Sequence, residues 1–380
     1  MSRGHEEAAV GGHGVRLLVS GGGTAGHVYP ALAALDAWEH SGHPRPDVRW
    51  VGSPGGMERD IIAQRGLPFH AVASGPLRGA SPLKTAWSLL RLLVGLVQSV
   101  VLLARLRPQV VLTTGGYVSV PVAVAAWLLR RPVVVFLPDV VPGLAVRLQA
   151  RVATRVAASF EDATAALPRK RTVVTGYPVR PALLEADPSA ARAALGLGED
   201  DLPVLLLYGG SLGARTLNYG VAPVLPEILE RCHFIHVSGQ LDHDELERRT
   251  AELPPTLAAR YHLHAFLGDR LVDAMAAADL CIARAGASTL AELPAVGLPA
   301  VVVPGPFSDQ QANAEYLERR GAALVLSNEA ARAGALGGLV LQMLDDPDGR
   351  AAMAEASRAL ARPDAAERLN AEVRALARGR

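Results

Sequence analysis

Short apolar runs alternate with longer segments of helical periodicity through most of the chain. Apolar runs of this length, bounded by turn residues, are typical of strands in parallel sheets, which are buried on both faces. They predict two sets of strands: Arg16–Ser20, Val48–Val51, Val110–Thr113, Val133–Phe136 and Arg155–Ala158, then Val204–Tyr208, Phe234–Val237, Leu280–Ala283 and Ala300–Val303. The pattern indicates an α/β protein with parallel sheets and right-handed crossovers.

A stretch rich in proline, glycine and acidic residues separates the two sets of strands and predicts a domain boundary near Pro178–Pro181. We expect a flexible tail at 1–14, an N-terminal domain over 15–178 and a second domain over 179–358. A C-terminal helix is expected over 359–380, and it can return to the N-terminal domain.

Composition narrows the function classes. Half of the 380 residues are hydrophobic but only 4% are aromatic, which predicts a large core of Ala, Leu and Val. The formal charge is +1, from 38 basic and 37 acidic residues, and it gives no reason to expect nucleic acid as a partner. Cys232 and Cys281 lie far apart and are expected to be buried free thiols in a reducing compartment. The first residues do not resemble a signal peptide.

The first predicted strand runs into a glycine turn in which Gly21, Gly23 and Gly26 satisfy G-x-G-x-x-G. Such a turn at a helix N-terminus favours an anion. A dinucleotide site also needs an acidic residue at the end of the second strand, where this chain has Gly52 and Ser53. The pattern therefore argues against NAD.

Two further turns follow strands of the second set. One is "YGGSLGART", and in the other a strand meets Arg284–Ala287 before a helix that carries Ser288, Thr289 and Glu292. The helix start can bind a phosphate, and Glu292 can accept hydrogen bonds from a ribose diol. Alternatively, Ser288 is a helix cap and Glu292 a solvated residue. Glycine turns in both halves favour two similar domains that face a shared ligand cleft.

Several motifs occur in an order that resembles the MurG family of bacterial glycosyltransferases: "GGTAGHVYPA", "TTGGYVSVP", "VPGLA", "GYPVR", "GGSLGAR", "RAGASTLAE" and "DQQANAEYLERRGAA". The resemblance spans about Val15 to Ala323. It implies a GT-B fold, in which two Rossmann-like parallel-sheet domains face each other across a cleft. It also implies inverting transfer of N-acetylglucosamine from UDP-GlcNAc to the 4-hydroxyl of undecaprenyl-diphospho-MurNAc-pentapeptide, with no metal and no cofactor.

The resemblance further implies a donor site in the second domain. It assigns the diphosphate, sugar, uracil and ribose contacts to Thr24, Ala25, Gly26, Arg180, Ser211, Leu267, Ala287, Ser288, Thr289, Glu292, Gln310 and Gln311, with Asn313 in support. None of the motifs holds an Asp-x-Asp pair, and a helix N-terminus with an arginine can stabilise a departing diphosphate without Mg²⁺.

His27 follows the first glycine turn and is the candidate general base for the acceptor hydroxyl. The positive end of a helix disfavours imidazolium, so a neutral ring that accepts a proton is expected. A role in ligand binding without proton transfer is the alternative.

One departure from the family falls on the acceptor side. Where members usually have His-Glu-Gln-Asn, this chain has Phe136, Leu137, Pro138 and Asp139. The hypothesis is that Asp139 contacts the acceptor sugar or orients His27.

The most apolar segment, Pro82–Pro108, contains Arg91 and Gln98, and helical periodicity places Trp87, Leu90 and Val94 on one side. Packing on the domain core is expected to cover most of its apolar surface. A flank edged by Arg78, Lys84 and Arg91 is expected to bind an anionic membrane surface, which would make the protein peripheral on the cytoplasmic face.

Three other functions keep the same architecture. A related transferase can use a different lipid or natural-product acceptor, and a UDP-sugar epimerase shares the architecture. A non-catalytic UDP-sugar-binding subunit is the third, although both half-sites and His27 argue against it.

Overall fold

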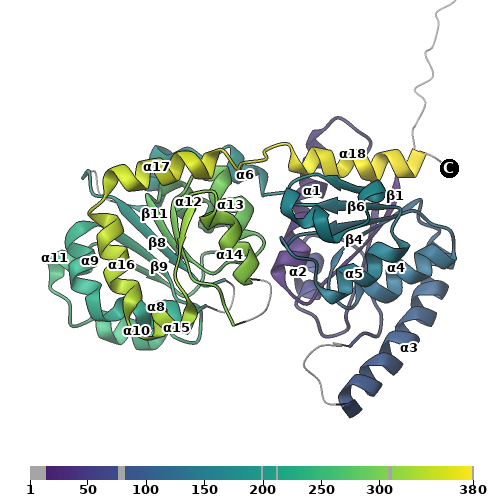
Figure 1. Ribbon diagram of the computed structural model, residues 1–380, viewed down its shortest axis with the longest axis horizontal. Coiled ribbons are helices and arrows are strands. Elements are labelled where there is room, and N and C mark those ends of the chain that lie inside the picture. Colours follow the sequence, from purple (N-terminus) through teal and green to yellow (C-terminus); the bar gives the residue numbers. More distant parts are fainter. Residues whose placement is uncertain (1–13, 76–81, 198–199, 211–212, 307–309, 379–380) are drawn as a thin grey trace, which may run out of the picture.

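The computed structural model describes residues 14–75, 82–197, 200–210, 213–306 and 310–378. These residues form two lobes that lie side by side, each built on a parallel sheet flanked by helices (Figure 1). The N-terminal lobe has strand order β3-β2-β1-β4-β5-β6-β7, and the C-terminal lobe has β10-β9-β8-β11-β12-β13. The predicted α/β class with two parallel sheets is confirmed.

All of the strands predicted from apolar runs are present, with ends that differ by a residue or two. In the N-terminal lobe the strands are β1 (Arg16–Gly21), β2 (Asp47–Gly52), β3 (Phe69–Ala71), β4 (Val110–Gly115), β5 (Val133–Leu137), β6 (Arg155–Ala158) and β7 (Thr172–Val174). In the C-terminal lobe they are β8 (Val204–Tyr208), β9 (His233–Val237), β10 (Tyr261–His264), β11 (Leu280–Ala283), β12 (Ala300–Val302) and β13 (Ala323–Val325). Every residue of β4, β5, β8, β9 and β11 is buried, as expected for strands covered on both faces.

Helices connect the strands. The N-terminal lobe contains α1 (Ala25–His40), α2 (Glu58–Gln64), α3 (Pro82–Leu106), α4 (Ser119–Leu128), α5 (Leu144–Val152) and the short 3₁₀ helices η1 (Glu161–Ala166) and η2 (Arg169–Arg171). The segment after β7 and the C-terminal lobe contain α6 (Pro181–Leu184), α7 (Pro188–Leu195), α8 (Arg215–Val221), η3 (Ala222–Val224), α9 (Leu225–Arg231), α10 (His243–Thr250), α11 (Pro255–Ala258), η4 (Gly268–Arg270), α12 (Leu271–Ala277), α13 (Thr289–Val296), α14 (Gln310–Glu318), α15 (Asn328–Arg332), α16 (Ala335–Leu344) and α17 (Pro347–Arg358).

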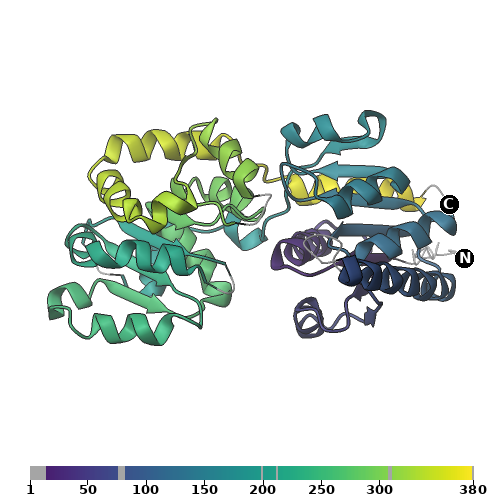
Figure 2. The same ribbon diagram turned by 60° about the horizontal axis from the view of Figure 1, so that its bottom comes forward.

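The last helix, α18 (Ala365–Arg378), packs on the N-terminal lobe, although it follows the whole C-terminal lobe in sequence (Figure 2). Its Asn370 side chain donates a hydrogen bond of 2.7 Å to the backbone carbonyl of Ala34 in α1. Leu369 and Val373 are buried in the same core cluster as Trp38 of α1. The chain therefore passes between the lobes twice.

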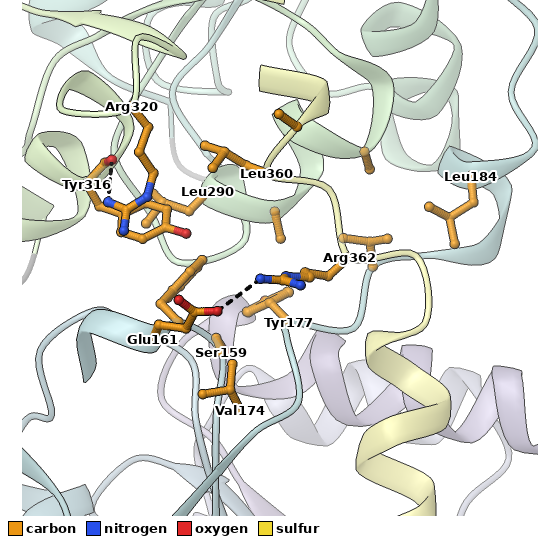
Figure 3. Close-up of a pocket in the computed structure, with 15 residues that line it drawn as sticks. Ser159, Glu161, Val174, Tyr177, Leu184, Leu290, Tyr316, Arg320, Leu360 and Arg362 are labelled. Carbon is orange, nitrogen blue, oxygen red and sulfur yellow. Dashed lines mark hydrogen bonds and ion pairs between the residues drawn. The ribbon is translucent and has the colours of Figure 1, made fainter. Parts of the chain in front are cut away.

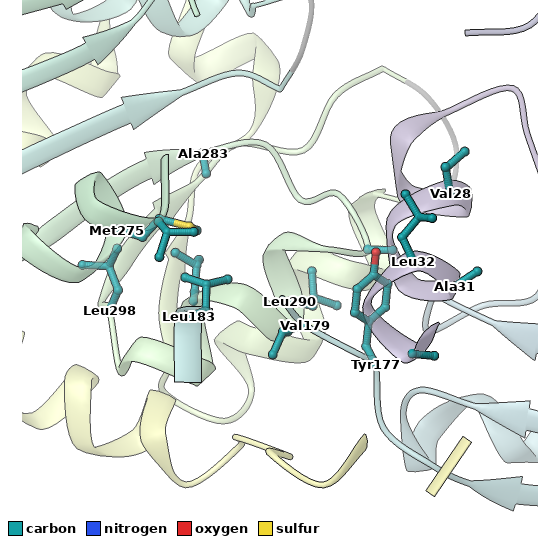
Figure 4. Close-up of a cluster of buried hydrophobic side chains, with 14 of the residues drawn as sticks. Val28, Ala31, Leu32, Tyr177, Val179, Leu183, Met275, Ala283, Leu290 and Leu298 are labelled. Atoms are coloured by element: carbon teal, nitrogen blue, oxygen red, sulfur yellow. The ribbon is translucent and has the colours of Figure 1, made fainter. Parts of the chain in front are cut away.

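Apolar side chains continue across the junction of the lobes. One buried cluster joins Val28 and Leu32 of α1 to Leu290 of α13, through Tyr177 and Leu183 of the connecting segment (Figure 4). This shared core gives the junction the packing of a domain interior.

Ion pairs also link the lobes. Asp162 of η1 accepts hydrogen bonds from Arg319 at 2.9 Å and from Arg320 at 2.7 Å. The neighbouring Glu161 pairs with Arg362 at 3.2 Å, beside a cavity of about 90 Å³ at the junction (Figure 3). Arg320 also stacks on the ring of Tyr316 with its guanidinium carbon 3.8 Å from the ring centre. The ion pairs of Asp162 and Glu161 therefore connect η1 of the N-terminal lobe to residues that follow α14 and α17.

Candidate active site

A cavity of about 670 Å³ lies between the lobes and is lined by both. Its lining residues follow the carboxyl ends of strands in the two sheets, which is where ligands bind in open α/β folds. They are Thr24, Gly26 and His27 after β1, Pro138 and Asp139 after β5, Tyr208, Gly209, Gly210, Gly213, Ala214, Arg215 and Thr216 around the β8 turn, Arg284, Gly286, Ala287, Ser288 and Thr289 after β11, and Gly305, Pro306, Gln310, Asn328 and Arg332 from the later turns.

His27 lies in the first turn of α1, and its ring is held by polar contacts at Nδ1. Its Nδ1 atom is 3.1 Å from the carbonyl oxygen of Gly22 and 3.0 Å from Thr24 Oγ1. Because a carbonyl oxygen can only accept, the neutral ring carries its proton on Nδ1 and donates it to Gly22. The lone pair is then on Nε2, as a general base requires.

The position of the His27 ring depends on close contact with the last residues of β4. Gly115 has φ +113°, and a Cβ placed on it would lie 2.6 Å from His27 Cδ2 and 2.8 Å from Nε2. The hydroxyl of Thr114 donates to the backbone carbonyl of His27. Only glycine leaves room for the ring at this point, since ordinary contacts of a Cβ lie at 3.4–4 Å.

A buried carboxylate, that of Glu58, supports the first glycine turn by accepting hydrogen bonds from it and from Ser53. Glu58, at the start of α2, is fully buried and accepts hydrogen bonds from Gly23 N at 3.1 Å, Ser53 N at 2.8 Å and Ser53 Oγ at 2.5 Å. A Cβ on Gly22 would lie 2.3 Å from its Oε1 atom. Burial raises the pKa of Glu58, but the hydrogen bonds from Ser53 and Gly23 outweigh this, and its pKa lies below the ordinary value.

Glu58 gives a physical reason why this turn departs from a dinucleotide site. The backbone N–H of Gly23, which in such a turn is a phosphate donor, is bonded to an internal carboxylate. Sequence reasoning missed Glu58, because its approach to the turn depends on how α2 packs after β2.

The turn after β11 places hydroxyl groups at the N-terminus of α13. Ser288 and Thr289 line the cavity, and the Tyr208 hydroxyl lies 3.5 Å from Thr289 Oγ1. One turn further on, Glu292 is 13% exposed and lies 3.4 Å from Arg180 Nη2. Burial raises the pKa of Glu292, while Arg180 and a hydrogen bond with Ser288 oppose that rise. Glu292 is thus a nearly buried, paired carboxyl group, not the solvated residue of the alternative interpretation.

Three cavity-lining arginines were not among the sequence candidates. Arg284 donates to the carbonyls of Val303 and Pro304 and to Asn328 Oδ1, so it ties three turns of the C-terminal lobe together. Burial, and then the positive charge of Arg332, lower the pKa of Arg284. Arg215 lies 3.8 Å from Asp242. No motif spacing marks arginines as ligands, so their convergence follows only from the fold.

The structure brings together part of the predicted site. The cavity is lined by the predicted residues Thr24, Gly26, His27, Asp139, Ala287, Ser288, Thr289 and Gln310. Among the described residues that do not line it, Arg180 and Glu292 pair at its edge, Leu267 is buried, Gln311 donates to Glu315 along its own helix, and Ala25 begins α1. Ser211 lies outside the described residues. The binding roles themselves stay predictions.

The two apolar residues of the departing segment, Phe136 and Leu137, have a structural role at the end of β5. Phe136 and Leu137 end the strand and are buried, and the Phe136 ring packs edge-on against Tyr177 with centroids 5.8 Å apart. The Tyr177 hydroxyl donates to the Gly26 carbonyl at 3.4 Å. Only Pro138 and Asp139 of the four residues line the cavity. Phe136 and Leu137 therefore pack in the core, and Phe136 supports Tyr177, which contacts the first glycine turn.

Comparisons with known proteins agree with this geometry. Residues 17–158 match the glycosyltransferase family 28 N-terminal domain, and residues 204–369 match the glycosyltransferase family 28 C-terminal domain. The UDP-N-acetylglucosamine--N-acetylmuramyl-(pentapeptide) pyrophosphoryl-undecaprenol N-acetylglucosamine transferase of Roseiflexus sp. (strain RS-1) is 42% identical over 93% of each chain. The protein of the same name from Desulforudis audaxviator is 40% identical over 92% of this chain and 95% of its own.

A solved structure shows the same architecture. The crystal structure of Acinetobacter baumannii MurG superposes with a TM-score of 0.74 at 28% identity, covering 95% of this chain and 99% of that one. The predicted GT-B fold, with two parallel-sheet domains facing a cleft, is thereby confirmed. With both halves matched and a relative above 40% identity over nearly the full length, this chain belongs to the MurG family of glycosyltransferase family 28.

Proposed function

We propose that this protein transfers N-acetylglucosamine from UDP-GlcNAc to the 4-hydroxyl of undecaprenyl-diphospho-MurNAc-pentapeptide (lipid I), which forms lipid II for peptidoglycan synthesis. The observation that carries the proposal is a single cavity in which His27 of one lobe faces the turns after β8 and β11 of the other. The names of the relatives describe this activity.

The reaction is a single displacement with inversion. Nε2 of His27 accepts the proton of the acceptor 4-hydroxyl while that oxygen bonds to C1 of the sugar. The bond from C1 to the donor diphosphate breaks at the same time, and UDP leaves with the electron pair. The carbonyl of Gly22 holds the Nδ1 proton by a hydrogen bond, so Nε2 is the ring atom that faces the acceptor proton.

The C-terminal lobe holds the donor in this proposal. Ser288 and Thr289, at the N-terminus of α13, receive the diphosphate and stabilise the negative charge that grows as UDP departs. Glu292 accepts from the ribose hydroxyls while Arg180 keeps its carboxyl group paired. Gln310 and Gln311 contact sugar hydroxyls, and Leu267 packs against the uracil. These roles, and transfer without a metal ion, come from the family resemblance.

Acceptor-dependent release of UDP tests the proposal. The purified protein is incubated with labelled UDP-GlcNAc and a short-chain lipid I analogue, and we expect a disaccharide product. His27→Ala should lose at least about a hundredfold in kcat, the lower range for a positioned base, and keep its affinity for UDP-GlcNAc. His40→Ala, an exposed histidine on the same helix, is the matched control. Donor binding without transfer to the analogue would overturn the lipid I assignment.

A different acceptor is the second candidate, and the apolar residues at the end of β5 favour it. Phe136 and Leu137 give no polar groups to the cavity at positions where the family usually has His and Glu. The same assay with polyprenyl-diphosphate sugars that lack the peptide, and with soluble glycosides, separates the two. Faster turnover of any of these than of the lipid I analogue would favour this candidate.

We also propose that α3 attaches the protein to the membrane surface. One helix within the described residues, Thr85–Leu106, is long and apolar enough by length and composition to cross a membrane. Only 17% of its most apolar 18-residue stretch is buried in the structure. Many of its large apolar side chains face outward, and Trp87, Leu93 and Val97 are more than 60% exposed. The expectation that core packing covers most of this surface is wrong.

The reason is that the first part of α3 packs on its lobe through small residues, while Leu103 near its C-terminus is buried in the core of the lobe. Ser88, Gly95 and Ser99 are buried, and a Cβ on Gly95 would lie 2.0 Å from the Ala73 carbonyl oxygen. Arg91 lies on the exposed side, and Arg78 falls outside the described residues. The face of α3 that holds Trp87, Leu93 and Val97 is therefore apolar and not covered by the lobe, and the boundary between lipid headgroups and acyl chains can cover it.

Vesicle sedimentation tests the attachment. We expect binding to vesicles of phosphatidylglycerol and phosphatidylcholine that weakens with phosphatidylcholine alone and in Leu93→Gln/Val97→Gln. Leu241→Gln, which changes an 88% exposed leucine of the other lobe, is the control. Equal binding by the α3 variant would refute this role.

A further inference from the structure

Asn313 of α14 connects the two walls of the cavity. Its side chain is fully buried and makes three hydrogen bonds. Oδ1 accepts from Val140 N at 3.0 Å, and Nδ2 donates to Asp139 Oδ1 at 2.9 Å and to the Ala285 carbonyl at 3.1 Å. Both N–H donors of the amide are thus in use, together with its oxygen.

These bonds join segments on opposite sides of the cleft. Asp139 and Val140 follow β5 in the N-terminal lobe. Ala285 belongs to the turn after β11 and is followed by Gly286, Ala287 and Ser288, which line the cavity in front of α13. One buried amide therefore sets the distance between the acceptor-side turn and the donor-side turn.

The carboxylate of Asp139 gives this amide one orientation. An ionised carboxylate only accepts hydrogen bonds, so Nδ2 of Asn313 must face Asp139 and Oδ1 must face Val140 N. A rotated amide would place oxygen against oxygen and N–H against N–H. The hydrogen bond to a charged acceptor is also stronger than one between neutral groups.

We propose that Asp139 and Asn313 are a positioning pair that holds the donor turn at Ala285 in register with the lobe that carries His27. This inference rests on the proposed function for its kinetic consequence. In-line transfer needs the reacting atoms about 3–3.5 Å apart, and a shift on the order of 1 Å can cost about a hundredfold in rate. The pair acts through geometry, so its loss lowers kcat more than it raises the KM for the acceptor.

A swap of the two side chains tests the pair. Asn313→Asp sets two carboxylates against each other, and we expect kcat to fall on the order of tenfold to a hundredfold. Adding Asp139→Asn restores an N–H···O contact between the two residues in the reverse direction, although the Ala285 carbonyl stays without its donor, and should regain part of the loss, up to about tenfold. Asp139→Ala breaks the same bond without placing a second charge in the core, and should fall further than Asp139→Asn. Asp187→Ala, which removes an aspartate that caps α7 away from the cavity, is the control.

Two readouts separate this inference from the proposed function. UDP affinity by calorimetry needs no acceptor. It should weaken in Asn313→Asp and recover only in part in the double variant, because the contact with residue 139 is restored while the Ala285 carbonyl still lacks its N–H donor. If the wild type binds UDP but transfers nothing to lipid I, the proposed function is refuted. The UDP affinities of the single and double variants would still show whether the two side chains are coupled. An additive double variant, or a change confined to the acceptor KM in Asp139→Asn, would overturn the inference and assign Asp139 to direct acceptor contact.

Discussion

Replacing Gly115 with alanine should disable His27 without removing any of its atoms. The added Cβ would meet the ring at 2.6 Å from Cδ2 and 2.8 Å from Nε2, whereas ordinary contacts lie at 3.4–4 Å. The ring must therefore move by roughly 1 Å, and a displacement of that size costs about a hundredfold in rate when a reacting group depends on alignment. Since φ is +113°, an alanine also costs about 1–2 kcal/mol in backbone strain.

Steady-state kinetics and calorimetry separate these two effects. Gly115→Ala should lose kcat but keep its affinity for UDP-GlcNAc, because the donor turns belong to the other lobe. Gly42→Ala is the matched control, since φ is +72° there and a Cβ would meet nothing within 4 Å. Both variants should lose similar stability in urea denaturation, and only Gly115→Ala should lose turnover. Wild-type kcat in Gly115→Ala would refute the argument that the His27 ring position limits the reaction.

Three further variants probe the groups that hold the cleft in shape. Glu58→Gln should lose about 1–3 kcal/mol in urea denaturation at pH 7, because an amide N–H then faces a backbone donor. The pKa of Glu58 is lower in the folded state than its ordinary value of 4.5, so the stability that its ionised form contributes is complete above pH 4.5 and is lost as the pH falls further. The difference in free energy of unfolding between Glu58→Gln and the wild type should therefore shrink at low pH. Asp162→Asn breaks partly exposed ion pairs and should cost at most about 1 kcal/mol, seen as a small fall in Tm. Leu369→Ala opens a cavity under α18 and should cost about 2–5 kcal/mol by the same denaturation assay.

The candidate site was predictable where one strand-turn-helix unit contains all of its chemistry. His27 and the Ser288–Thr289 pair each follow a buried strand and open a helix, so local spacing is enough to mark them. Glu58 could not be found in this way, and Asn313 was named only through the family resemblance, without its contact to Asp139. Each acts on a turn that is distant in sequence, and a lone Glu or Asn has no spacing that distinguishes it from a surface residue.

The same contrast holds for the fold. The sequence by itself determined the central strands, because residues covered on both faces must be apolar along the whole run. The four strands it did not reveal, β3, β7, β10 and β13, are all at sheet edges. Those strands are short and mostly half-buried, with polar residues such as His70 and Thr172, so pairing with an existing neighbour decides them.

Tertiary structure also decided which side of α3 faces the lobe. Apolar periodicity predicts burial of the large side chains, but Trp87, Leu93 and Val97 are exposed, whereas Ser88, Gly95 and Ser99 are buried, with Leu103 nearer the end of the helix. At Gly95 the Ala73 carbonyl lies too close for any side chain. Periodicity reports which residues share a face of a helix, and the shape of the surface that receives it selects which face is buried.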